Sequence, residues 1–187
     1  MAIFLLKNEF GEFKNIKPIK RNEQLCLVDN YGYPMLNTWQ PINFEWDIED
    51  GNKPRDIFLY LGYILIGNGK SVSALRMMID NSKCEILPIK IDKEEYYVFN
   101  ICETLVNVLD RRKSKIEYFK DKSIKWISQY VFSPDYKDTP IFHIAEMSSP
   151  IFVSDTIVEY IKEAGLIGLK FEECKQDKSS FFKSIFK

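Results

Sequence analysis

The sequence predicts a single α+β domain, with a mixed but mostly antiparallel sheet and two similar short helices packed on it. Two observations lead to this class. Short apolar segments recur along the chain and are separated by Gly, Pro, Asn and Asp, as in strands joined by turns. In addition, residues 72–91 and 153–171 share a pattern that predicts strand, helix and strand in that order.

Composition indicates one folded domain with a sizeable core. The chain has 187 residues, of which 45% are hydrophobic, including 14 Phe and 10 Tyr. The net charge of −1 argues against the overall basic field of a nucleic-acid-binding protein, although it is compatible with a local basic patch. The apolar segments are shorter than the roughly 18–20 residues that span a bilayer. We therefore expect a cytoplasmic protein with no nucleic-acid partner.

The cysteines predict neither a metal site nor another cofactor. Cys26, Cys84, Cys102 and Cys174 are far apart and form no C-x-x-C pair, and the chain has a single histidine. Cys84 and Cys102 flank a predicted hairpin whose turn centres on Lys93, which would place the two thiols opposite each other. Two free thiols are favoured over a disulfide in a reducing cell.

Residues 1–55 are expected to contribute short strands and loops to the same domain. The apolar residues 2–6 predict the first strand, and residues 25–29 predict a second. A segment rich in turn signals follows, and it contains a short strand at 42–46.

Residues 56–173 are expected to form the core of the domain. Pro88 predicts an edge position or a bulge for its strand, and residues 123–132 fit either a strand or a helix. The predicted segments are an apolar run at 57–66, a helix at 74–81, a hairpin of strands at 85–91 and 95–101, a strand at 141–147, a turn at 148–150, an extended piece at 151–153, a helix at 155–164 and a strand at 167–173.

The two helices begin with the same dipeptide. Val72 and Ser73 precede the first, and Val153 and Ser154 precede the second. Ser73 and Ser154 are placed as N-caps, whose hydroxyls accept a backbone N–H of the first turn. Each valine would then pack against an apolar residue of its helix, Met77 or Val158.

Two features that could indicate catalysis are explained structurally. Gly-Lys-Ser at 69–71 resembles the end of a phosphate-binding loop, but Ile64 stands where that loop needs glycine. We interpret the stretch as the approach to a helix. His143 has no evident nucleophile or orienting partner, so we assign it a structural role. No catalytic residue is predicted, and we expect that the protein is not an enzyme.

The candidate partner-binding residues are acidic and aromatic. The segment FEWDIEDG alternates acidic with apolar residues, which predicts a strand with one acidic face. That face is either an ordinary solvated surface or a patch that attracts a basic partner. The candidates are Glu45, Trp46, Asp47, Glu49 and Asp50.

The C-terminal segment 174–187 forms a basic aromatic tail. Residues 178–187 have the pattern of a short amphipathic helix. We favour packing of this tail on the protein's own surface over contact with a membrane or a partner.

Over residues 56–173, about two-thirds of the chain, the order and spacing of these motifs resemble the eleventh immunity-protein family of bacterial polymorphic toxin systems. The residues that carry the resemblance are Asp56, Ser73, Leu87-Pro88-Ile89, Tyr96-Tyr97, Leu109-Asp110 with Ser114, Ile141-Phe142, Val153-Ser154, Gly165, Leu166, Gly168 and Phe171.

The resemblance implies a cytoplasmic immunity protein that binds and neutralises a cognate protein toxin. It implies no catalytic residues and no cofactor. The alternative is a protein-interaction or regulatory module without a toxin partner. The sequence identifies neither the toxin and its activity, nor the inhibitory surface, nor the oligomeric state.

Overall fold

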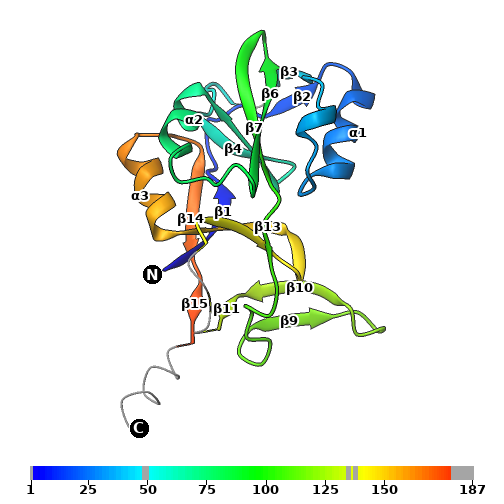
Figure 1. Cartoon of the computed structure of the whole chain (residues 1–187), viewed down its shortest axis with the longest axis vertical. Coiled ribbons are helices and arrows are strands. Elements are labelled where there is room, and N and C mark those ends of the chain that lie inside the picture. The colour runs from blue at the N-terminus through cyan, green and yellow to red at the C-terminus, as the bar shows by residue number, and fades with distance from the viewer. Residues whose placement is uncertain (1, 48–50, 134–135, 137–138, 178–187) are drawn as a thin grey trace.

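Two larger sheets dominate the architecture (Figure 1), which confirms the predicted α+β class. The structure is a computed structural model that describes residues 2–47, 51–133, 136 and 139–177. Within these ranges the larger sheets have six and five strands, and two further sheets have two strands each. The helices α2 (Gly69–Leu75) and α3 (Asp155–Glu163) contact each other beside the sheets.

The six-stranded sheet has the order β2-β3-β6-β7-β5-β4. Helix α1 (Arg21–Asn30) and the short 3-10 helix η1 (Leu36–Thr38) lie between β2 and β3 in the sequence. The strands are β2 (Ile16–Pro18), β3 (Asn43–Trp46), β4 (Ile57–Tyr60), β5 (Ile64–Asn68), β6 (Cys84–Ile91) and β7 (Glu94–Ile101).

The five-stranded sheet has the order β14-β1-β13-β12-β8, so the first strand of the chain pairs with β14 from its C-terminal part. Its strands are β1 (Ile3–Asn8), β8 (Thr104–Leu105), β12 (Ile141–Ile144), β13 (Met147–Ser154) and β14 (Leu169–Glu173). The two-stranded sheets pair β9 (Lys115–Tyr118) with β10 (Ile124–Gln129), and β11 (Val131–Phe132) with β15 (Lys175–Gln176).

The predicted strand-helix-strand repeat is present in both sheets. In the first unit, β5 and β6 lie on either side of β7, and both are antiparallel to it. In the second, β13 and β14 lie on either side of β1, again both antiparallel. Each helix therefore connects two parallel strands that are separated by one antiparallel strand.

Three predicted elements were wrong. Residues 25–29 belong to helix α1 instead of a strand, because one side of this segment packs inward through the fully buried Leu27. The first repeat helix covers Gly69–Leu75 rather than 74–81. The turn expected at 148–150 instead lies at 145–146, and β13 runs through the expected turn without interruption.

The β6–β7 hairpin was predicted correctly, but its register was wrong by one residue. Asp92 and Lys93 have φ angles of 48° and 73°, as expected of a two-residue turn. Cys84 consequently faces Ile101 rather than Cys102, and both cysteines are free thiols. Pro88 lies where β6 lacks a neighbour on one side, since β3 pairs only with Lys90 and Ile91, which agrees with the predicted edge position.

The predicted caps were wrong at one helix and right only in position at the other. Asn68 is the N-cap of α2, and its Oδ1 accepts the Ser71 N–H at 3.1 Å. Ser73 lies inside the helix and donates to the Gly69 carbonyl at 2.9 Å. Met77 is 89% exposed, so no staple forms there. Ser154 occupies the N-cap position of α3, but its hydroxyl forms no capping bond.

Replacing Asn68 with Ala should lower the free energy of unfolding by about 1–2 kcal/mol. Besides capping α2, the Asn68 amide donates to Asp56 Oδ1 at 2.8 Å, and this bond is also lost. Ser73→Ala is the control, and it should change stability by only a few tenths of a kcal/mol, because a serine that bonds back into its own helix contributes little. Urea unfolding of the two variants would measure both values. A larger loss of stability for Ser73→Ala than for Asn68→Ala would instead support Ser73 as the N-cap of this helix.

Candidate functional site

The candidate site is a two-stranded ribbon and the cleft beside it. Among the described residues, β9 and β10 pair only with each other, and the pairing contains two register shifts. Figure 1 shows them at one end of the molecule, beside β13 and away from the six-stranded sheet. We call residues 111–129, which contain both strands and their flanking turns, the basic ribbon.

The apolar face of the basic ribbon is fixed to the aromatic core. Ile127 is buried, and Ile116 and Ile124 are partly buried against the same cluster. At the centre of this cluster, the Phe152 ring lies 5.2 Å from the Phe132 ring and 5.0 Å from the Tyr130 ring, centroid to centroid. The ribbon is therefore held in a defined position although its strands pair with no other strand in the described part of the chain.

Three aromatic side chains of the basic ribbon remain accessible. Tyr118, Phe119 and Trp126 are 50%, 54% and 55% exposed. Large aromatic side chains are enriched at protein–protein contacts, where their burial supplies much of the binding energy. Their placement on a protruding ribbon makes this part of the surface a candidate for contact with a partner.

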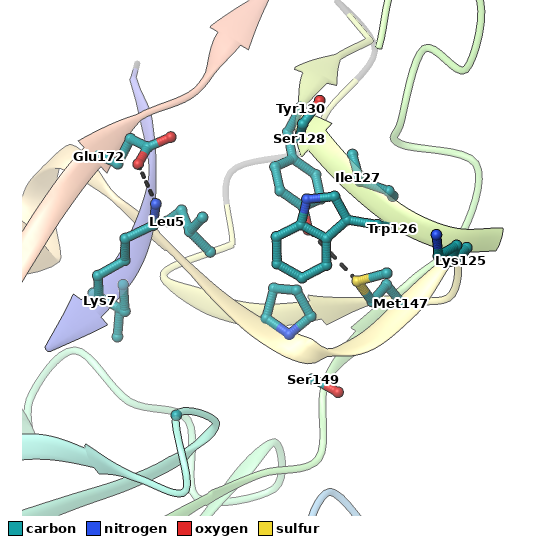
Figure 2. Close-up of a pocket in the computed structure, with 13 residues that line it drawn as sticks. Leu5, Lys7, Lys125, Trp126, Ile127, Ser128, Tyr130, Met147, Ser149 and Glu172 are labelled. Atoms are coloured by element: carbon teal, nitrogen blue, oxygen red, sulfur yellow. Dashed lines mark hydrogen bonds and ion pairs between the residues drawn. The ribbon is translucent and has the colours of Figure 1, made fainter. Parts of the chain in front are cut away.

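The cleft lies between the basic ribbon and the five-stranded sheet. Figure 2 shows the Trp126 side chain inside it, close to Met147 and opposite Leu5, Lys7 and Glu172. Its volume is about 440 Å³. The lining residues are Leu5, Leu6, Lys7, Gly62, Lys125, Trp126, Ile127, Ser128, Tyr130, Met147, Ser149, Pro150 and Glu172.

The polar groups of the cleft include an ion pair and a tyrosine hydroxyl. Lys7 and Glu172 form an ion pair with each other at its rim. The Tyr130 hydroxyl lies 3.7 Å from Met147 Sδ, and burial raises the pKa of Tyr130 to about 12, so the phenol stays protonated near neutral pH. The described residues include no group of three His, Cys, Asp or Glu side chains arranged to hold a metal ion.

His143 contacts one of the residues that line the cleft. It is 2% exposed, and its Nδ1 lies 2.9 Å from the carbonyl oxygen of Pro150, a residue that lines the cleft. Nδ1 therefore carries the proton and donates it, since a carbonyl can only accept. Nε2 is buried and has no hydrogen-bond partner in the described structure. This geometry agrees with the structural role expected for His143.

Acid should destabilise the protein through His143. Burial lowers the pKa of this imidazole below its usual value of about 6.5. Between the two pKa values the unfolded chain binds the proton and the folded chain does not, so stability falls as pH drops through about 6.5 towards the folded pKa. Each unit of difference between the folded and unfolded pKa of His143 corresponds to a loss of about 1.4 kcal/mol in the free energy of unfolding at low pH.

His143→Asn provides the test of this pH dependence. The asparagine amide can still donate to Pro150 but does not titrate, so the stability of the variant should vary less between about pH 7.5 and pH 5. Urea unfolding at a series of pH values measures the two slopes. Equal slopes for both proteins would show that His143 does not cause the acid sensitivity.

The acidic residues proposed from the sequence form a different surface. Glu45 and Asp47 point outward, and each lies near Lys17, at 3.6 and 3.7 Å. Trp46 points inward, is 7% exposed and packs edge-on against Tyr96, so its assignment as a partner-binding residue was wrong. In the alternating pattern of β3, Trp46 is on the face that points into the core. Partner binding by Glu45 and Asp47 stays a prediction.

The remaining two candidates of that set, Glu49 and Asp50, lie outside the described residues. The proposed tail helix at 178–187 does so as well.

A comparison with protein-family models supports one interpretation of the sequence. Residues 88–176 match the immunity protein family Imm11. The resemblance found in the sequence is thereby confirmed over this part of the chain. A search of curated proteins returned no match. None of the helices in the described ranges has the length and apolar character needed to cross a membrane.

The whole basic ribbon lies inside the part of the chain that matches Imm11, and so do the cleft residues from β10, β13 and β14. The sequence analysis did not single out the ribbon. A detectable signal was present, because residues 111–125 contain seven Lys or Arg and interleaved aromatics.

Proposed function

We propose that this protein is an immunity protein that binds a cognate toxin stoichiometrically and blocks its activity. The match of residues 88–176 to an immunity protein family is the observation that carries the proposal. Binding of a protein fits the half-exposed Trp126 and the aliphatic side chains that line the cleft. We also propose that the protein acts in the cytoplasm.

The experiment is co-expression with the toxin domain encoded beside this chain's gene. Cells that make the toxin alone should stop growing, and cells that make both proteins should grow. A stoichiometric inhibitor should fail once the toxin is in excess, whereas an enzyme that inactivates the toxin would protect at ratios well below one.

Purified proteins give the second readout. The two chains should elute together in size-exclusion chromatography and reach saturation at a fixed ratio in calorimetry. Growth arrest in the presence of equal amounts of the chain, together with separate elution, would refute the immunity function. Protection at a small fraction of the toxin concentration would indicate catalysis instead of binding.

A further inference from the structure

We infer that the basic ribbon and its cleft dock an acidic surface of the cognate toxin, with Trp126 as the central apolar contact. This inference rests on the proposed function and adds the inhibitory surface and the chemistry of the surface it covers. It is carried by the distribution of charge, by the exposed aromatics and by the order of the ribbon tip.

Positive charge is concentrated in the basic ribbon. Residues 111–129 contain seven Lys or Arg and two Asp or Glu, a net charge of +5, in a chain whose net charge is −1. The rest of the chain has 19 basic and 25 acidic residues, a net charge of −6. A local field of this kind speeds association with a surface of opposite sign.

Most of this charge is available to a partner. At the base of the ribbon, Arg111 pairs with Glu146 at 3.4 Å and Lys113 pairs with Asp177 at 2.6 Å, which ties the ribbon to the body. The cations that are exposed and form no ion pair with any residue of the described ranges are Arg112, Lys115, Lys120 and Lys122.

The tip of the ribbon is ordered before a partner arrives. The Asp121 carboxylate accepts the Ser123 N–H at 2.9 Å and its hydroxyl at 2.6 Å, and the Phe119 N–H donates to the Ser123 carbonyl at 2.8 Å. The same bonds from Ser123 hold the pKa of Asp121 below its usual value. A preformed turn reduces the conformational entropy that binding would otherwise cost.

The cleft supplies the apolar part of the contact. The half-exposed indole of Trp126 lies in the cleft close to Met147 (Figure 2), and Pro150 and Lys125 line the same cleft. A tryptophan that becomes fully buried at the centre of an interface is a frequent hot spot. The acidic partner should therefore present an apolar group that covers Trp126.

An acidic protein explains this surface better than a nucleic acid does. Across the cleft from Trp126, Lys7 is already paired with Glu172, and Leu5, Leu6 and Met147 line the same cleft. This part of the described surface therefore offers apolar contacts to a protein and no further free cation to a phosphate backbone. The same inference restricts the toxin. The toxin surface that contacts the ribbon should be acidic, whereas the groove of an enzyme that acts on nucleic acid is basic.

The test measures binding of an inactivated form of the toxin domain encoded beside this chain's gene. Lys120→Glu/Lys122→Glu should weaken binding about tenfold or more, mainly through slower association, and wild-type affinity should fall between about 50 and about 300 mM salt. Trp126→Ala should weaken binding about 30-fold, mainly through faster dissociation.

The control is Lys90→Glu/Lys93→Glu on the β6–β7 hairpin. It makes the same charge change at another exposed hairpin, and Lys93 and Lys122 both occupy left-handed turn positions, with φ angles of 73° and 68°. Its affinity should stay within about twofold of the wild type, since charges beyond a Debye length are screened. Thermal unfolding of each variant establishes that it is folded before binding is compared.

The outcomes separate the two proposals. If the wild type protects cells and binds the toxin, while the ribbon variants bind equally well, the ribbon inference is wrong and the immunity function stands. If the wild type neither protects nor binds, both fail. Tight binding of a 20-nucleotide single strand that is lost in the ribbon variants would overturn the choice of an acidic protein.

Discussion

Phe152→Ala should lower the free energy of unfolding by about 3–5 kcal/mol, as is typical when a fully buried phenylalanine is truncated. Phe152 has no exposed surface, and its ring centroid lies 5.0 Å from Tyr130, 5.2 Å from Phe132 and 5.7 Å from Phe142. Truncation removes these contacts and leaves a cavity that rigid neighbours cannot fill. Chemical denaturation would measure the loss.

The consequence should extend to the candidate site. Tyr130 lines the cleft, and Ile127 of the basic ribbon belongs to the same buried cluster as Phe152. Hydrogen exchange of the amides of β9 and β10 should therefore become faster in Phe152→Ala than in the wild type. In a chain that loses so much stability, local opening of this end is expected before global unfolding.

Phe119→Ala provides the matched control. It removes the same atoms from a ring that is 54% exposed at the ribbon tip, so it should cost less than about 1 kcal/mol. If the two variants were equally stable, the aromatic cluster would not be the support of the ribbon that the structure indicates.

The strands were predictable because their signals are local. Apolar runs and Gly or Pro breaks placed several of the longer strands, such as β1, β6, β7 and β14, and the α3 helix, and the shared pattern revealed the repeat. The α1 helix was missed because only Leu27 of its residues is buried, so the segment has almost no helical periodicity. The register of β6 with β7 was wrong because a shift of one residue at the Asp92-Lys93 turn changes every opposing pair. The N-cap of α2 was wrong because this helix begins at Gly69, before the expected start.

The candidate site was not predictable from local patterns. The cleft combines Lys7 near one end of the chain with Trp126 and with Glu172 near the other. The pairing of β1 with β14 brings Lys7 to Glu172, and packing of the ribbon on the aromatic cluster brings Trp126 to both. For Trp46, the error was to assign a buried residue to the surface. Its place among acidic residues suggested a surface, although strand alternation directs it into the core.

Gly168, one of the residues that carry the resemblance to the immunity family, lies where two parts of the fold meet. Gly168 lies between α3 and β14, against the start of β4, and its carbonyl accepts the Glu9 N–H at 2.9 Å. Its neighbour Ile167 accepts the backbone N–H groups of Asp56 and Ile57 at 3.0 and 3.2 Å. This contact joins the two strand-helix-strand units, because Asp56 also bonds to Asn68 at the start of α2.

Gly168→Ala should therefore destabilise the fold by about 3 kcal/mol, through backbone strain and overpacking together. Gly168 has a φ of 121°, which L-residues rarely adopt, and an added Cβ would lie 2.4 Å from the Ile57 carbonyl oxygen and 2.9 Å from Arg55 Cβ. The carbonyl belongs to a buried strand and cannot move without breaking the junction.

Gly165→Ala is the comparison for Gly168→Ala, because it introduces a side chain at a positive φ without overpacking. Gly165 also has a positive φ, 58°, but an added Cβ would meet no atom within 4 Å, so this variant should cost only about 1 kcal/mol for its left-handed backbone. Urea unfolding of both variants measures the difference, which combines the close approach to Ile57 with the greater strain of a φ of 121° than of 58°. Equal losses would mean that backbone conformation alone requires glycine at 168 and that the two units are joined less tightly than their hydrogen bonds indicate.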